Sequence, residues 1–372
     1  MARAFGIINS SGNHIYVEGM QDYRPIGAFS FLGRYRAIDF PMSNMSNSEI
    51  EQIQVYLNQK PRSIVEHLGT GRHYNINSKN GKVKLLFADN RSVTSIYNTD
   101  IAYFAENMES IQSARYPYVV IAPSYMIYTQ DYDKLLNKHI ESGADVTLLY
   151  HTEENPNENF LNCDMLELNR QKGVEAIKRN RGNNTAAANI FMDTYVMSKE
   201  IFIELINKAR SLSSMYGLVQ IVNLCCKERD VRGVAHEGYF ATLTDFKSVY
   251  KANMDLIDIN KANELFHEDW PIYTRTNDSC PTQYFEDASV KSSVVSNGCL
   301  ISGTIEHSVI GRGCTIGKGC VIKNCVISSE ATIADGTHLE NIIVDKHASI
   351  LHAKEIIAEE NNPGYVKRGD TI

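Results

Sequence analysis

Residues 309–327, VIGRGCTIGKGCVIKNCVI, decide the fold of the C-terminal part of the chain. The aliphatic residues Ile310, Ile316 and Ile322 stand six positions apart, and Ile327, Ile333 and Leu339 repeat this step. A period of six is typical of a parallel β-helix, in which each coil stacks its aliphatic side chain on the next because one coil alone cannot bury it. The sequence therefore predicts a left-handed parallel β-helix over residues 285–372.

Small residues and glycines fit the same coils. Small side chains come two positions before most of the aliphatic residues, at Cys314, Cys320, Ala331 and Thr337. Glycines suited to the corners are Gly311, Gly313, Gly317 and Gly319. A glycine-rich antiparallel sandwich would not keep a step of six residues. The cysteines at small inward positions are interpreted as buried thiols and not as a metal site.

Three histidines of this region, His307, His338 and His347, raise the alternative of a hexapeptide acyltransferase, which uses a histidine base. No second feature of such an enzyme accompanies them. Solvated histidines in turns are the simpler interpretation.

The chain before residue 259 has a different pattern. Short apolar runs at 5–9, 118–124 and 145–151 are typical of buried strands, and they alternate with helical spacing at 46–58, 98–114 and 130–143. A last helical pattern covers 246–266. Alternation of this kind predicts a mostly parallel, Rossmann-like sheet with helices on both faces. We expect an α/β domain over 1–258, a linker over 259–284 and the β-helix over 285–372.

Composition excludes several classes of protein. The 372 residues include 44 acidic and 37 basic ones, for a formal charge of −7, which argues against nucleic-acid binding. No apolar run is long enough for a membrane span, and the N-terminus shows no signal peptide. The eight cysteines form no C-x-x-C pair. Reduced thiols in a cytoplasmic protein are therefore expected.

A polar constellation lies within FLGRYRAIDFPMSN, residues 31–44. Gly33 permits a close approach of the backbone, and in an extended segment Arg34 and Arg36 point to the same side. Asp39 follows shortly after. Paired arginines beside a sheet suit phosphate groups. A surface patch of ion pairs is the alternative that spacing alone leaves open.

These residues carry a family resemblance. The segment 33–44, GRYRAIDFPMSN, resembles one of the ADP-glucose pyrophosphorylases, also called glucose-1-phosphate adenylyltransferases. Further similar segments are SIVEHLGTGRHYNI at 63–76, HEGYF at 236–240, SVYKANMDLID at 248–258 and DWPIYTRTNDSCP at 269–281. The resemblance implies a sugar-nucleotide nucleotidylyltransferase fold joined to a β-helix. It also implies a tetramer that acts in glycogen synthesis in a bacterial cytoplasm.

The first loop departs from the family. Active members have a loop of the form G-G-G-x-G-T-R-L, whereas residues 9–16 are NSSGNHIY, with Gly12 as the one glycine. Fewer glycines let fewer backbone N–H groups close around a phosphate. The loop resembles a phosphate loop that has lost its function.

The metal site departs as well. Active members hold Mg²⁺, which aligns ATP and glucose 1-phosphate, with two aspartates. The matching positions are Tyr125 and Thr242, and Asp245 lies nearby but displaced in register. Since Mg²⁺ prefers anionic oxygen ligands, we expect no metal and no catalytic residue here. Any Mg²⁺ would belong to a catalytic partner.

The sugar-phosphate positions change in the same direction. Lys178 and Arg179 align with a family Glu-Lys pair, and Phe191 and Asp193 align with small residues that they would crowd. The segment 215–222, MYGLVQIV, lacks the charges of its family counterpart. We expect a residual nucleotide and sugar-phosphate cleft made of Arg24, Gly33, Arg34, Arg36, Asp39, His67, Gly69, Gly71, Asp100 and Arg179.

Such losses on a preserved scaffold resemble the GlgD-type, non-catalytic subunits of this family. The resemblance implies a regulatory subunit that forms a hetero-oligomer with a catalytic paralogue, or a homo-oligomer alone, and that binds ATP, glucose 1-phosphate or a phosphorylated effector weakly. The alternative is an active nucleotidylyltransferase whose metal site is rebuilt around Asp245 or Asp100.

Overall fold

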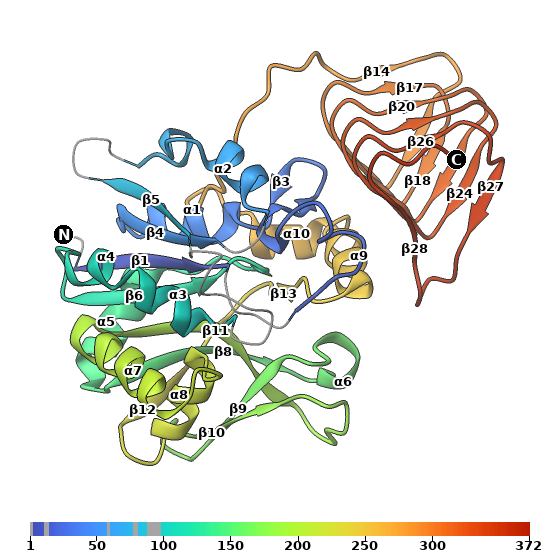
Figure 1. Ribbon diagram of the computed structural model, residues 1–372. Helices are drawn as coiled ribbons and strands as arrows, with labels where there is room; N and C mark the ends of the chain where they lie inside the picture. Colours follow the sequence, from blue (N-terminus) through green and yellow to red (C-terminus); the bar gives the residue numbers. More distant parts are fainter. Residues whose placement is uncertain (1–2, 11–14, 58–59, 77–80, 88–97) are drawn as a thin grey trace. The chain divides into compact units, whose positions relative to one another are not determined.

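The computed structural model describes residues 3–10, 15–57, 60–76, 81–87 and 98–372 (Figure 1). Gly12 and most of the first loop lie outside the described residues. The chain forms two compact units. Unit 1 consists of residues 1–14, 40–240 and 270–273, and unit 2 of residues 15–39, 241–269 and 274–372. The β-helix thus shares its unit with a segment from near the N-terminus and with the helices that precede the connector.

Unit 1 is built on a mixed nine-stranded sheet. Its strands are β1 (Ala4–Asn9), β4 (Gln52–Leu57), β5 (Lys82–Phe87), β6 (Tyr118–Pro123), β8 (Val146–Glu153), β9 (Asp164–Leu168), β10 (Val174–Arg179), β11 (Ala188–Ser198) and β12 (Val231–Ala235). Parallel pairing joins β5, β4, β1 and β6 in that order, and β12 pairs parallel to β8. Strand β11 runs antiparallel to β6, β8 and β9. The predicted α/β sheet is confirmed.

Helices cover both faces of this sheet. The helical elements are α1 (Asp39–Asn47), α2 (Arg62–Leu68), η2 (Arg72–Tyr74), α3 (Asp100–Glu106), α4 (Met108–Gln112), α5 (Tyr132–Ser142), α6 (Pro156–Asn159), α7 (Lys199–Leu212) and α8 (Leu218–Cys225); a short strand, β7, spans Met126–Ile127. Phe5 and Ile7 of β1 share a buried core with Phe104 of α3 and Phe202 of α7. Gly6, between them, faces Met45 of α1, whose sulfur lies 2.6 Å from where a Cβ would stand. Successive residues of β1 therefore pack on opposite layers of helices.

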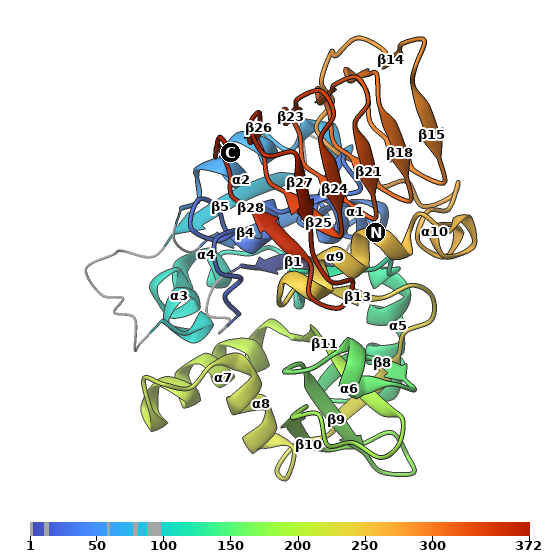
Figure 2. The same cartoon turned by 90° about the vertical axis from the view of Figure 1, so that its right-hand side faces the viewer.

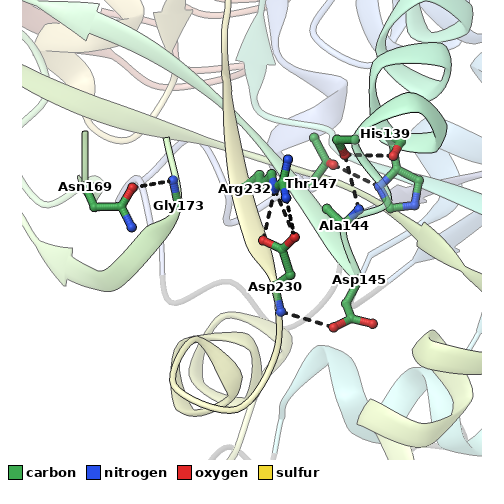
Figure 3. Close-up of polar contacts among 9 residues, drawn as sticks. His139, Ala144, Asp145, Thr147, Asn169, Gly173, Asp230 and Arg232 are labelled. Carbon is green, nitrogen blue, oxygen red and sulfur yellow. Dashed lines mark hydrogen bonds and ion pairs between the residues drawn. The ribbon is translucent and has the colours of Figure 1, made fainter. Parts of the chain in front are cut away.

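Polar contacts join α5 to β8, and the start of β8 to the start of β12 (Figure 3). Nδ1 of His139, near the end of α5, lies 2.8 Å from the hydroxyl of Thr147 on β8. The backbone N–H of Asp230 donates to Asp145 at 3.1 Å, just where these two strands begin. His139 is buried, and that burial lowers the pKa of its imidazole.

Three helix predictions are wrong in detail, and in one of them the segment 98–114 forms two helices, α3 and α4. The segment 46–58, predicted as a helix, contains strand β4, whose Ile53, Val55 and Leu57 are buried. Pairing with β1 on one side and β5 on the other decides the outcome. The segment 246–266 forms two helices, α9 (Phe246–Asp255) and α10 (Ile259–Leu265). Asp258 separates them because its carboxylate accepts the N–H of Asn260 and starts the second helix.

The β-helix of unit 2 consists of three sheets of five parallel strands each. The first sheet contains β14 (Gln283–Tyr284), β17 (Leu300–Ile301), β20 (Thr315–Ile316), β23 (Thr332–Ile333) and β26 (Ser349–Ile350). The second contains β15 (Ser289–Lys291), β18 (Thr304–Glu306), β21 (Val321–Lys323), β24 (His338–Glu340) and β27 (Glu355–Ile357). The third contains β16 (Val294–Val295), β19 (Val309–Ile310), β22 (Val326–Ile327), β25 (Ile342–Val344) and β28 (Gly364–Val366).

The predicted aliphatic residues form the interior of this β-helix. Ile310, Ile316, Ile322, Ile327, Ile333 and Leu339 are all buried in one core. The predicted left-handed β-helix is confirmed. At its C-terminal end the last residues of the chain cap the final coil, since Leu351 donates its N–H to the carbonyl of Ile372 at 2.7 Å.

The third sheet is covered on its outside by other parts of unit 2. These parts include α9, which follows β13 (Ala241–Thr242), and a segment that carries η1 (Ile26–Ala28), β2 (Ser30–Phe31) and β3 (Tyr35–Arg36). Tyr250 of α9 donates its hydroxyl hydrogen to the carbonyl of Asn324 at 2.7 Å, and the ring of Phe246 packs on that of Tyr365. Figure 2 shows α9 beside β25 and β28. The outward residues Val309 and Val326 are therefore buried.

Candidate functional site

The first candidate site lies in unit 1, at the carboxyl edge of the parallel strands. Strands β1 and β6 are neighbours, and the N–H of Ser124, just after β6, donates to the carbonyl of Asn9 at 3.2 Å. Ligands of open α/β sheets bind at this kind of edge. Tyr125 follows Ser124 directly, so its side chain belongs to the edge where a ligand would be expected.

A buried carboxyl occupies this region. Strand β11 has an irregular register between Phe191 and Tyr195, and within it Asp193 adopts a left-handed φ of 45°. Tyr125 donates its hydroxyl hydrogen to one carboxyl oxygen of Asp193 at 3.3 Å, and Tyr195 donates to the other at 3.0 Å. Burial raises the pKa of Asp193 to about 8, with a further contribution from the charge of Asp100. At neutral pH the three side chains form a neutral, hydrogen-bonded cluster.

Asp100 is held by backbone groups. It opens α3, and its carboxylate accepts the N–H of Leu218 at 2.9 Å and that of Ile101 at 2.8 Å. The side-chain amide of Asn9 donates to its second oxygen at 3.3 Å. Burial raises the pKa of Asp100 to about 6, although these hydrogen bonds oppose the shift. Asp100 thus caps the first turn of α8 and fixes the end of β1 to it.

The remaining predicted residues of unit 1 are Arg179, His67, Gly69 and Gly71. Arg179 of β10 forms an ion pair with Asp164 of β9 at 3.2 Å. His67 is buried at the end of α2, and its ring lies 6.0 Å from that of His73. Gly69 and Gly71 follow with left-handed φ values of 51° and 76°, which favour glycine. Burial raises the pKa of the Tyr125 phenol and the charge of Arg179 opposes that rise, so Arg179 lies close to the tyrosine–aspartate cluster.

A second candidate site lies in unit 2 and contains Arg24, which is only 3% exposed. Its guanidinium forms an ion pair with Asp345 at 2.7 Å. Tyr365 donates its hydroxyl hydrogen to the same carboxylate at 2.8 Å, and so does the N–H of Lys346 at 2.7 Å. Among the described residues, Nε and one terminal nitrogen of Arg24 have no hydrogen-bond acceptor.

Further cations surround this ion pair. Burial lowers the pKa of Lys346 to about 7, and the charges of Arg36, Arg24 and Arg368 lower it further. Burial also lowers the pKa of Arg312, and the charge of Arg34 lowers it further. The carboxylate of Asp345 is therefore set against Arg24, Arg36, Lys346 and Arg368. Arg34 and Arg312 lie close to the carboxylate of Asp39. We call Arg24, Arg34, Arg36, Arg312, Lys346 and Arg368 the cation cluster.

Gly33 and Asp39 shape the segment that carries the arginines. Gly33 has a φ of 64°, and a Cβ there would stand 2.7 Å from the carbonyl oxygen of Ile310, so only glycine fits against the β-helix corner. Asp39 is fully buried, and its carboxylate accepts the N–H of Arg36 at 2.8 Å. The predicted site residues thus divide between two units, with Arg24, Gly33, Arg34, Arg36 and Asp39 in unit 2 and the others in unit 1.

The positions that resemble a family magnesium site do not fit that ion. Tyr125 places a phenol in hydrogen-bond contact with Asp193, and Thr242 is a buried hydroxyl on β13. Asp245 is the N-cap of α9, where its carboxylate accepts the N–H of Ser248 at 2.7 Å. Asp100 and Asp245 each use one carboxylate oxygen to cap a helix.

Sequence reasoning missed Tyr195, Arg312, Asp345, Lys346 and Arg368. The signal for Asp345 and Lys346 is a charged pair directly after the apolar strand β25, where the coil pattern would continue with a small neutral residue. Tyr195 and Arg368 offered no comparable signal. In the part of the chain that is described, no helix is both long and apolar enough to span a bilayer.

Comparison with known proteins agrees with this architecture. A family model for "Nucleotidyl transferase" matches residues 23–223, and one for "GlmU-like, C-terminal hexapeptide" matches residues 281–362. The "Glycogen biosynthesis protein GlgD" of Geobacillus stearothermophilus is 29% identical over 326 residues, which cover 86% of this chain and 83% of the relative. GlgD of Bacillus subtilis (strain 168) is 26% identical over 369 residues, covering 98% and 95% of the two chains.

A catalytic relative is about as similar. The "Glucose-1-phosphate adenylyltransferase" of Geobacillus stearothermophilus is 30% identical over 302 residues, which cover 80% of this chain and 77% of the relative. The nucleotidyl transferase match, the hexapeptide match and these relatives all agree with the two architectures that the structure contains. The chain therefore belongs to the glucose-1-phosphate adenylyltransferase family of nucleotidyl transferases.

Proposed function

We propose that this chain is a regulatory subunit of glucose-1-phosphate adenylyltransferase in glycogen biosynthesis. Alone it turns over little or no ATP and glucose 1-phosphate. It acts by forming a hetero-oligomer with a catalytic subunit and by changing that subunit's rate or its response to effectors. Two of the relatives carry the name glycogen biosynthesis protein GlgD, which supports this direction.

One observation carries the proposal: the phenol of Tyr125 stands at the carboxyl edge of the sheet and is hydrogen-bonded to Asp193. Nucleotidyl transfer between two polyanions needs a metal to offset their charge, and a neutral phenol bound to a neutral carboxyl does not supply its ligands. Losing that compensation costs several kcal/mol in the transition state, so we expect rates lower by orders of magnitude.

The cation cluster supports a second part of the proposal, which is binding of a phosphorylated effector. Its positive groups outnumber the carboxylates of Asp345 and Asp39, and the buried Arg24 is little screened by solvent. Arginine forks suit phosphate oxygens. A subunit without chemistry changes its partner only through differences in contact between conformational states, and an effector bound here would bias such states.

The test is to mix the chain with a catalytic glucose-1-phosphate adenylyltransferase subunit and to measure ADP-glucose formation, with and without phosphorylated metabolites. We expect a complex by size exclusion and a changed rate or effector response. The Arg34→Ala/Arg36→Ala variant should keep the complex and lose only the effector-dependent part. No complex and no change in rate would refute the regulatory role.

An assay of the isolated chain tests the alternative function, that of an active nucleotidylyltransferase. An active enzyme with a rebuilt metal site would release pyrophosphate from ATP and glucose 1-phosphate in the presence of Mg²⁺. Turnover within tenfold of a catalytic relative would establish that alternative. The helix-capping roles of Asp100 and Asp245 argue against it.

A further inference from the structure

The β-helix stacks its small inward residues in columns, and one column brings two cysteines together. In the first sheet Leu300 pairs in register with Thr315, and the N–H of Leu300 donates to the carbonyl of Cys314 at 2.9 Å. Cys299 and Cys314, each one residue before its strand, therefore occupy neighbouring rungs. By the same register, the column as a whole consists of Thr282, Cys299, Cys314, Ala331 and Ala348.

The other cysteines of the coils have different neighbours. Register places Cys320 between Gly303 and Thr337, and it places Cys325 between Ser308 and Ile342. Among the described coils, Cys299 and Cys314 are the one pair of thiols on adjacent rungs. All the cysteines are free thiols in this structure.

The spacing of adjacent rungs suits a disulfide. Neighbouring strands lie about 4.8 Å apart, and disulfides join Cα atoms separated by about 4.4–6.8 Å. Both side chains are fully buried in the interior of the β-helix. The sulfur of Cys299 lies 3.1 Å from the carbonyl oxygen of Gly311, and the sulfur of Cys314 lies 3.2 Å from that of Ser328. Each thiol thus leans in the same direction, toward the following coil.

The two thiols also interact with each other. Their mutual influence lowers the pKa of Cys299 and raises the pKa of Cys314. Since the thiolate is the nucleophile in thiol oxidation, Cys299 is the sulfur expected to react first.

We propose that Cys299 and Cys314 are a modification site at which a peroxide forms a reversible disulfide between the second and third coils of the β-helix. The Cys299 thiolate attacks one oxygen of hydrogen peroxide and the O–O bond breaks. Cys299 becomes a sulfenic acid, and hydroxide is the leaving group. The Cys314 sulfur then attacks the Cys299 sulfur, and the hydroxyl group leaves as water with the Cys314 proton. Two thiols are oxidised and one peroxide is reduced to water. A thiol reductant reverses the reaction.

The open end of the β-helix provides access. Only the first coil, which holds β14, separates Cys299 from that end. Tyr284 and Phe285 of this coil remain 55% and 47% exposed, although Tyr284 is in register with the buried Ile301. A coil with so little burial opens locally at low cost, and opening uncovers Cys299. Once formed, the disulfide would tie the second coil to the third and limit further fraying.

The experiment uses the full chain with Cys280→Ser, because Cys280 is the exposed thiol and would otherwise link two chains. The protein is treated with hydrogen peroxide, its remaining thiols are alkylated after denaturation, and the peptides are mapped by mass spectrometry. We expect one linked peptide pair that contains Cys299 and Cys314, and an intact mass lower by two hydrogens. The unfolding temperature should rise on oxidation and return with dithiothreitol.

Three variants in that background complete the test. Cys299→Ser and Cys314→Ser should each lose both the linked pair and the shift in unfolding temperature. Cys325→Ser, a buried thiol of the same coils without a cysteine on an adjacent rung, should keep both. If both thiols are still alkylated after oxidant treatment, or if the linked pair involves other cysteines, the proposal is overturned.

Discussion

The hydroxyl of Tyr125 donates a hydrogen bond to the carboxyl of Asp193, 68 residues further along the chain, across 3.3 Å. Tyr195 holds the other oxygen of that carboxyl at 3.0 Å. Burial keeps Asp193 protonated, although the hydrogen bonds from the two phenols favour its charged form. The edge of the sheet in unit 1 is therefore filled by its own side chains. The predictions below follow from this cluster, from the buried histidines and from the β-helix.

Asp193→Asn should remove a pH dependence of stability. The folded chain keeps a proton on Asp193 up to about pH 8, whereas an unfolded aspartic acid releases it near pH 4. The folded state therefore binds more protons in this window, and its stability falls as the pH rises through it. At pH 8.5 the variant should be more stable than the original chain by about 5 kcal/mol, while near pH 4 the difference should nearly vanish.

Urea unfolding at a series of pH values measures this effect. Asparagine tolerates the left-handed φ of 45° at this position, so the backbone should stay as it is. Glu175→Gln, which changes an exposed carboxylate on β10, should leave the pH profile unchanged. A profile for Asp193→Asn that overlies the original would show that the carboxyl is ionised in the folded state.

His236→Gln should act in the opposite direction. Burial lowers the pKa of His236 to about 4, and its Nδ1 lies 3.1 Å from the side-chain oxygen of Gln130, which glutamine can still contact. Between about pH 4 and 6.5 the unfolded chain binds more protons, so stability is lost as the pH falls. The variant should lose about 2 kcal/mol less than the original chain between pH 7 and pH 4.5.

The acid midpoint of unfolding, followed by circular dichroism, checks this prediction. His352→Gln alters an exposed histidine and serves as the control. His139, beside Thr147 in Figure 3, also has a lowered pKa and will keep part of the acid sensitivity in the variant. An acid midpoint that moves as far in His352→Gln as in His236→Gln would contradict the assignment.

Ile316→Asp should unfold the β-helix. Ile316 stacks between Ile301 and Ile333 in the core, so the variant would bury a charge without a partner. The cost is several kcal/mol, and we expect at least about 4. Thr315→Asp, one residue earlier on the outer face of the same strand, should cost less than about 1 kcal/mol. Thermal unfolding of the two variants compares them, and equal melting temperatures would mean that the inward register is wrong.

Asp345→Asn should destabilise unit 2 because it leaves Arg24 and Lys346 without their carboxylate. Breaking a buried ion pair by removing one partner costs about 3–5 kcal/mol. Inorganic phosphate should stabilise this variant more than the original chain, since it offsets the uncovered positive charge. Asp370→Asn, at an exposed position of the same unit, is the matched control. A variant as stable as that control would show that the ion pair contributes little.

The regular parts of the fold could be predicted from sequence because their periods are local. The step of six residues identified the β-helix and its inward side chains correctly. The segment 46–58 was wrongly predicted as a helix because Ile50, Ile53 and Leu57 also fit helical spacing. It forms strand β4 because it pairs with a strand on each side. Pairing between distant strands is not visible in a window of a dozen residues.

The sites were predictable only in part, for a similar reason. Tyr125 and Asp193 each departed from the family pattern, but their hydrogen bond depends on the irregular register of β11. The ion pair of Arg24 with Asp345 joins residues 321 positions apart, and no spacing rule connects them. The paired Arg34 and Arg36 predicted phosphate binding. Arg312 and Lys346 belong to β-helix coils, for which the six-residue repeat predicted the fold and no ligand.

The ion pair between Arg24 and Asp345 also constrains how the chain is made. The ribosome releases the segment 15–39 early, and the carboxylate of Asp345, with which Arg24 pairs, follows 321 residues after that arginine. Phe29 and Phe31 are fully buried in the folded protein. They therefore stay exposed until the residues that cover them have been synthesised. Translation that stops before Asp345 would release a chain with these aromatic residues uncovered. Chaperones and proteases would then bind the exposed segment 15–39, although the missing residues are those around Asp345.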